Sequence, residues 1–153
     1  MARCLRSFRV MARKITDVMT PTPECCTADD SVIEVARVMD QRDVGIVPIV
    51  ESQDTRKLIG VVTDRDIVLR VVAQGRDPNV VICVKEVMTA EVVSCSPGDD
   101  LLHAEALMKE HQLHRILVVD DDGAVVGIVA TADLARTSDE TQTGDTIKAI
   151  TQP

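Results

Sequence analysis

The sequence predicts a mixed α/β fold built from two pseudo-symmetric β-α-β-β-α repeats that pack against each other through their sheets. Three observations carry this prediction. Short apolar runs rich in β-branched residues alternate with helical apolar stripes along the chain. The second half repeats the first in the same order, so that Gly60 and Asp66 recur as Gly127 and Asp133. The 153 residues suffice for two small units that share a core, whereas each unit alone would be marginal.

Repeat one is expected over residues 14–75, after a basic leader at residues 1–13. A helical turn at residues 15–19 stops before two prolines, and a short strand follows at residues 24–27. Asp29, Asp30 or Ser31 then provides the N-cap of a helix. The apolar face of this helix is formed by Val32, Val35, Ala36 and Met39.

Two strands and a second helix complete repeat one. Gly45 is expected to end the first helix, and residues 46–50 predict a buried strand with Pro48 near its entrance or on a sheet edge. Residues 58–62 predict the next strand. The pattern then becomes helical, and Gly75 is the expected stop. The apolar stripe of this second helix consists of Val68, Val71 and Val72.

Repeat two is expected to follow the same plan over residues 86–136, after a linker at residues 76–85. Its strands are expected near residues 92–95, at 115–119 and at 124–130, and its helices begin near Leu101 and at Thr131. Residues 137–153 predict a polar C-terminal tail with one short helix.

Composition excludes some classes of partner. The formal net charge is −8, whereas a nucleic-acid partner requires a basic face. Phe8 is the single aromatic residue and lies outside both repeats, so base stacking on aromatic side chains is also excluded. No apolar run is long enough to span a membrane. We therefore expect no nucleic-acid partner and no membrane partner.

The five cysteines are odd in number and show no metal-ligand spacing. This usage is typical of a reducing compartment rather than a disulfide framework, and it predicts a cytoplasmic protein. Cys25 and Cys26 would point to opposite faces of a strand, which disfavours a redox pair. A thiol-based redox sensor is nevertheless one hypothesis, and it rests on these two residues.

The junction between the strand at residues 58–62 and the helix after it carries the main functional pattern. Gly60 keeps the backbone approachable, while Thr63 and Asp66 place a hydroxyl and a carboxylate where strand becomes helix. Free amide N–H groups and the positive end of the helix dipole favour a phosphate at such a point. The carboxylate can accept hydrogen bonds from two vicinal ribose hydroxyls. The alternative is that Thr63 and Asp66 only cap the helix.

Three motifs occur in order and are duplicated. They are Val-Met-Thr at residues 18–20 and 87–89, Gly-x-x-Pro-Ile-Val at 45–50, and Gly-Val-Val-Thr-Asp-Arg-Asp at 60–66. With these motifs the chain resembles the cystathionine-β-synthase (CBS) domain family, and the pair resembles a stand-alone Bateman module. The resemblance implies a regulatory ligand that is an adenine nucleotide such as AMP, ADP, ATP or NAD. It also implies a homodimer, an unidentified protein partner, and signalling through conformation or partner binding.

The same resemblance implies roles for individual residues. In the family pattern the threonine contacts phosphate and the aspartate contacts ribose, and repeat one matches fully at Gly60, Thr63 and Asp66. Repeat two keeps Asp133 but has Ala130 where the hydroxyl belongs, with Thr131 displaced by one position. The remaining candidates are Arg65 and a His-Arg pair, His114 and Arg115, which some nucleotide-sensing members aim at phosphate.

Two readings of the His-Arg pair stay open, because a strand can also simply begin in solvent at these residues. If the pair does contact phosphate, His114 and Arg115 could contribute across the cleft to the ligand site of repeat one. That site would then bind the ligand more tightly than the site of repeat two. The family's catalytic members carry a separate catalytic domain, and no nucleophile triad, phosphate-binding glycine loop or paired histidine is found here, so no enzyme is expected. The main alternative to a nucleotide sensor is an interaction scaffold that binds no nucleotide.

Overall fold

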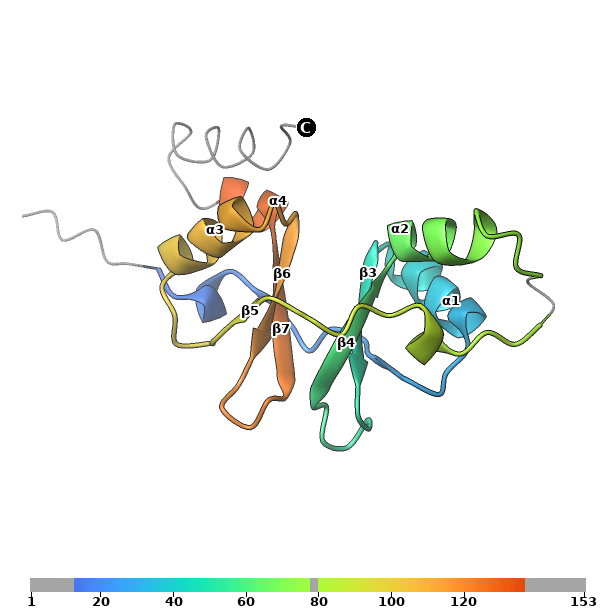
Figure 1. The fold of residues 1–153 in the computed structure, drawn as a ribbon. Coiled ribbons are helices and arrows are strands. Elements are labelled where there is room, and N and C mark those ends of the chain that lie inside the picture. Colours follow the sequence, from blue (N-terminus) through green and yellow to red (C-terminus); the bar gives the residue numbers. More distant parts are fainter. Residues whose placement is uncertain (1–12, 78–79, 137–153) are drawn as a thin grey trace, which may run out of the picture.

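The computed structural model describes residues 13–77 and 80–136, and it contains two sheets that face each other, with helices on their outer sides (Figure 1). The three-stranded sheet has the order β2 (Cys26–Thr27), β3 (Ile46–Val50), β4 (Leu58–Thr63). The four-stranded sheet has the order β1 (Thr20–Pro21), β7 (Val125–Ala130), β6 (Arg115–Val119), β5 (Ser94–Cys95). In both sheets a long antiparallel pair is extended by a short parallel strand. The mixed α/β fold with two similar units is therefore confirmed.

Helices cover the outer face of each sheet. Repeat one contributes η1 (Ile15–Asp17), α1 (Val32–Arg42), α2 (Asp64–Ile67) and a π-helical turn, η2 (Val68–Val72). Repeat two contributes η3 (Val84–Glu86), α3 (Leu101–Glu110) and α4 (Thr131–Ala135). The short helix expected in the C-terminal tail lies outside the described residues.

The first helix begins as expected but ends earlier. Ser31 is its N-cap and accepts a hydrogen bond from the Glu34 N–H, and Val32, Val35 and Met39 are buried in the core of the three-stranded sheet. The expected stop at Gly45 is wrong, because Asp43 already adopts the left-handed conformation, with φ of 52°. Aspartate tolerates this conformation better than most residues.

Pro48 occupies the middle of β3, which is the central strand of its sheet, and not the entrance or edge that was expected. The register explains why a proline is tolerated there. Pro48 is paired with Val61, but Val61 exchanges its two backbone hydrogen bonds with Thr89, each 2.9 Å long. The proline nitrogen thus faces the side of β2, whose pairing with β3 begins only at Ile49. No ladder hydrogen bond is lost.

The two Val-Met-Thr segments are exchanged between the repeats. The segment that opens repeat one joins the four-stranded sheet, because β1 pairs with β7, and Ile15 is fully buried in that core. The segment that opens repeat two lies against the three-stranded sheet, where Val87 is fully buried and Thr89 forms a bridge with Val61. Figure 1 shows both segments crossing between the sheets.

The apolar stripe expected on the second helix of repeat one is wrong in part. Val71 is buried, but Val68 and Val72 are 54% and 66% exposed, and their neighbour Leu69 is 47% exposed. The reason lies in the π-helical turn at residues 68–72, since a turn with more residues than an α-helix no longer places i, i+3 and i+4 on one face. Gly75 follows with φ of +63°, which suits the expected helix stop.

Substituting Gly60 by alanine should lower the free energy of unfolding by about 1–3 kcal/mol, the usual cost of overpacking. A Cβ there would lie 2.9 Å from the Thr89 carbonyl oxygen and 3.0 Å from Met88 Sδ, and the carbonyl is fixed by its hydrogen bond from Val61. Urea unfolding followed by circular dichroism measures the effect. Gly98→Ala is the matched control, because nothing lies within 4 Å of a Cβ at that position. Equal stabilities of the two variants would contradict this packing account.

Candidate functional site

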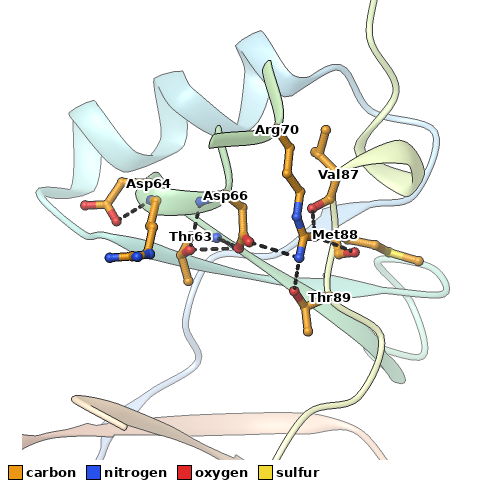
Figure 2. Close-up of polar contacts among 8 residues, drawn as sticks. Thr63, Asp64, Asp66, Arg70, Val87, Met88 and Thr89 are labelled. Atoms are coloured by element: carbon orange, nitrogen blue, oxygen red, sulfur yellow. Dashed lines mark hydrogen bonds and ion pairs between the residues drawn. The ribbon is translucent and has the colours of Figure 1, made fainter. Parts of the chain in front are cut away.

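The junction between β4 and α2 is built as a reciprocal capping box (Figure 2). The Thr63 N–H and hydroxyl both donate to Asp66 Oδ2, at 2.9 and 2.7 Å. The Asp66 N–H donates back to Thr63 Oγ1 at 3.2 Å. Threonine and aspartate at this spacing thus hold each other and fix the first turn of the helix. The capping role that the sequence left open is realised.

The backbone N–H groups at the start of this helix are all occupied by the chain itself. Besides the two bonds of the capping box, the Asp64 N–H donates to the Gly45 carbonyl at 3.1 Å, and the Arg65 N–H donates to Asp64 Oδ1 at 2.7 Å. The expectation that the amide groups are free at this helix start is therefore wrong, whereas phosphate binding there stays a prediction. A phosphate would have to displace these bonds or be held by a side chain.

The two oxygens of the Asp66 carboxylate differ in how many hydrogen bonds they accept. Its side chain is 16% exposed. Oδ2 accepts both hydrogen bonds from Thr63, whereas Oδ1 lies 3.5 Å from Nη2 of Arg70. Oδ1 is thus the oxygen on which a hydroxyl could take the place of the weak contact with Arg70.

Arg70 is a site residue that sequence reasoning missed. Its guanidinium donates to the carbonyls of Val87 and Met88, the latter at 3.1 Å, and to Thr89 Oγ1 at 3.3 Å (Figure 2). It connects the Asp66 carboxylate with the segment that opens repeat two. The i,i+4 spacing from Asp66 was visible in the sequence, but the two carbonyls come from a distant segment.

Gly60 is not open to a ligand as expected. The residue is buried, and the atoms nearest to a Cβ built on it belong to Met88 and Thr89. The missing side chain makes room for the exchanged segment of repeat two. Gly127 has the same role in repeat two, where Met19 of repeat one fills the space.

Arg115 is a residue of repeat two that the structure brings beside Gly45 of repeat one. It is the first residue of β6 and is exposed. Its Nη1 would lie 3.6 Å from a Cβ built on Gly45, and Asp64 Oδ2 would lie 3.1 Å from the same point. Among the described residues, the Arg115 guanidinium has no hydrogen-bond or ion-pair partner. A cation of repeat two thus stands beside the strand start of repeat one, next to the capping box.

The equivalent junction of repeat two lacks half of the box. The Ala130 N–H donates to Asp133 Oδ2 at 2.9 Å, but Ala130 has no hydroxyl to return a bond. Thr131, the first residue of α4, donates its N–H to the carbonyl of His114 at 3.0 Å. The His114 residue is exposed, as expected for a strand start.

A pocket of about 330 Å³ opens between the two sheets. It is lined by Thr20, Pro21, Thr22, Pro23, Glu24, Arg42, Val44, Ile46 and Ile128. Thr63 and Asp66 do not line it, but Ile46 is the cross-strand partner of Thr63, and directly paired residues point to the same face of a sheet. One residue of the pocket lining is therefore paired with Thr63 of the capping box, and the size of the pocket is at the lower end of small-molecule sites.

Neither a metal-binding cluster nor a membrane-spanning helix is found in residues 13–77 and 80–136. No three His, Cys, Asp or Glu side chains converge there on a point that could hold a metal ion. Nor does that part of the chain contain a helix with the length and apolar character needed to cross a membrane.

Comparison with known proteins identifies the fold. A family model described as CBS domain matches residues 15–73 and 84–140. The CBS domain-containing protein YhcV of Bacillus subtilis is 42% identical over 121 residues, which cover 79% of this chain and 82% of YhcV. The crystal structure of Hypoxic Response Protein I with two coordinated zinc ions has a TM-score of 0.72 at 31% identity, covering 83% of this chain and 100% of that chain.

A second solved structure is the CBS domain pair of protein MJ0100 in complex with 5′-methylthioadenosine and S-adenosyl-L-methionine. It has a TM-score of 0.71 at 26% identity, covering 82% of this chain and 94% of that chain. The fold of this chain is thus shared with a solved CBS domain pair. The chain belongs to the CBS domain family and carries two CBS domains in tandem.

Proposed function

We propose that this CBS domain pair is a regulatory module that binds an adenosyl ligand, such as AMP, ADP, ATP or NAD, in the pocket between its sheets. The observation that supports the proposal is that Ile46, which lines the pocket, pairs directly with Thr63, the capping partner of Asp66. The related pair of MJ0100, solved with two adenosyl compounds, supports this class of ligand.

The lining of the pocket suits the parts of such a ligand. Pro21, Val44, Ile46 and Ile128 offer apolar surface to a purine. Asp66 supplies the acceptor for a ribose hydroxyl, and Thr63 positions it. Because the backbone N–H groups of the helix start are occupied, we assign phosphate recognition to Arg115, which reaches across from repeat two, with the exposed Arg65 of repeat one as the second candidate.

The scaffold that binds no nucleotide is the second candidate, and one observation favours it. Thr63 and Asp66 satisfy each other without a ligand, so their presence is explained by the stability of the helix alone. The two candidates differ in whether Asp66 Oδ1 is ever used by a ligand. We propose signalling rather than catalysis in both cases.

A thiol sensor is disfavoured by the burial of the cysteines. Burial raises the pKa of Cys26 to about 11 and also raises the pKa of Cys25. The thiolate is the reactive form, so both thiols are unreactive near neutral pH. Four free cysteines in the described residues fit a reducing compartment such as the cytosol, where we place the protein.

We also propose a homodimer that forms through the exposed apolar face of repeat one, made of Val68, Leu69 and Val72. These three side chains lie on the helix that follows the third strand. The sequence predicts an interface made of this helix in each repeat and of the short helical segments near Val18 and Val87, but Val87 is fully buried within the chain. A second copy of the chain would cover them and remove apolar surface from water. An additional protein partner could bind the dimer in one arrangement of its two copies and not in another.

The first test is calorimetric titration with adenosine, AMP, ADP, ATP, NAD and S-adenosylmethionine. Asp66→Ala should weaken the tightest event about ten- to a hundredfold, since losing a hydrogen bond to a charged group costs about 1.5–3 kcal/mol. Asp133→Ala should affect only a weaker second event. Glu34→Ala is the matched control, because it removes the same capping contact from α1, away from the pocket.

Two results of this titration would contradict the proposal. If no ligand of the panel gives heat or a thermal shift at millimolar concentration, the scaffold is favoured. If Asp133→Ala abolishes the tight event and Asp66→Ala leaves it intact, the assignment of the site to repeat one is reversed.

Substituting Arg115 by alanine should lower the affinity for AMP and ATP by tenfold or more, because the proposed partner of Arg115 is the phosphate. The affinity for adenosine should stay almost unchanged. Isothermal titration of the three ligands measures the difference. Arg37→Ala, an exposed arginine on the outer helix α1, controls for the loss of one positive charge. Equal weakening of adenosine and AMP would show that Arg115 does not contact phosphate.

Placing a charge in the apolar face, as in Val72→Asp, should convert the dimer to a monomer, because the interface would have to bury an unpaired carboxylate. Light scattering coupled to size exclusion gives the mass. Leu102→Asp changes an apolar side chain that is 62% exposed on α3 and should leave the dimer intact. A monomeric mass of the unsubstituted protein would refute the dimer.

A further inference from the structure

Arg70 joins two parts of the molecule that belong to different repeats. Its guanidinium faces four oxygen atoms, which are Asp66 Oδ1, the carbonyls of Val87 and Met88, and the Thr89 hydroxyl. A guanidinium can serve several acceptors because its five N–H groups spread in a fixed plane. Figure 2 shows this side chain reaching from α2–η2 to the exchanged segment.

The carbonyls that Arg70 binds stand at a helix end. Val87 is the C-cap of η3, and helix ends leave carbonyls without partners in the helix. The same segment covers Gly60, and its Thr89 N–H donates to the Val61 carbonyl at 2.9 Å. The placement of residues 87–89 against the three-stranded sheet therefore depends in part on where the Arg70 guanidinium is held.

Asp66 is the acidic group that holds this guanidinium, through the oxygen that a ligand would use. Thr63 occupies Oδ2 with two hydrogen bonds, so Oδ1 is the oxygen left for a ribose hydroxyl. The ion pair at Oδ1 is 3.5 Å long and the Arg70 side chain is 45% exposed, so the contact is weak. A hydroxyl donated to Oδ1 and the Arg70 guanidinium are competitors.

We propose that Arg70 is a positioning residue that couples the ligand site of repeat one to the exchanged segment of repeat two: a ribose hydroxyl on Asp66 Oδ1 displaces Arg70 and loosens residues 87–89. The inference rests on the proposed adenosyl function and names how occupancy of that site is transmitted. The coupling belongs to repeat one, because the position equivalent to Arg70, four residues after Asp133, is Thr137 in the sequence.

The coupling has a thermodynamic counterpart. If the ligand displaces Arg70, then removing Arg70 must make the ligand bind more tightly, because the competitor is gone. Arg70→Gln should raise the affinity for adenosine about two- to fivefold, the size expected of a half-exposed ion pair. The affinity for 2′,3′-dideoxyadenosine should not change, because this compound lacks both ribose hydroxyls.

The test is hydrogen–deuterium exchange of the full chain, resolved at residues 84–92, together with calorimetry. Without ligand, Arg70→Gln should exchange faster than the unsubstituted protein at Thr89. Saturating adenosine should raise exchange at Thr89 in the unsubstituted protein and add little in Arg70→Gln. Arg76→Gln is the control: it removes the 2.6 Å ion pair with Glu86 next to the same segment but does not touch Asp66, so adenosine affinity should stay the same.

The possible outcomes distinguish failure of the coupling from failure of the proposed adenosyl-binding function. If adenosine binds but Arg70→Gln changes neither its affinity nor the ligand-free exchange at Thr89, the coupling is overturned and the function stands. Weaker adenosine binding by Arg70→Gln likewise overturns displacement, since Arg70 would then support the site. If no adenosyl compound binds the unsubstituted protein, the proposed function fails and the coupling fails with it, whatever Arg70→Gln does to ligand-free exchange.

Discussion

The exchange of the two Val-Met-Thr segments is the constraint on which the rest of the structure depends. Each sheet is bordered by a segment from the other repeat, through the β1–β7 pairing on one side and the Val61–Thr89 bridge on the other. Ile15 and Val87 are both fully buried in the core of the opposite repeat. Neither repeat has a complete core of its own, so the two sheets are held in a fixed relation and the pocket between them has defined walls.

The two repeats have similar junctions, which differ at single positions. In register, Ile46 and Thr63 of repeat one stand where repeat two has Arg115 and Ala130. Repeat one thus has the complete capping box and an apolar neighbour, while repeat two has a cation and half of the box. The placement of Arg115 beside Gly45 brings the cation of one repeat to the box of the other. The missing parts are complementary, which favours one composite site over two equal ones.

Local patterns predicted what depends on neighbours in sequence. The strands at residues 46–50 and 115–119 follow from apolar runs and are confirmed, and Ser31 is the N-cap among the three candidates that capping chemistry offered. Three of the errors share a different cause. Pro48, Gly60 and the missed contacts of Arg70 are all explained by residues 87–89, which pack on repeat one although they lie in the other half of the sequence. No periodicity within repeat one carries that information.

The hydrogen bonds at the junction limit which groups of a ligand repeat one can bind. The Thr63 hydroxyl hydrogen is directed to Asp66, and the N–H groups of residues 63–66 are occupied, so repeat one offers an acceptor for a sugar but few donors for a phosphate. The guanidinium of Arg115, which lies beside the capping box, belongs to repeat two. A ligand with both groups would therefore bind tightly only when the two repeats keep their relation. Since a ligand shifts a conformational equilibrium only by its differential affinity, this division of donor and acceptor between repeats is the physical means by which it could report.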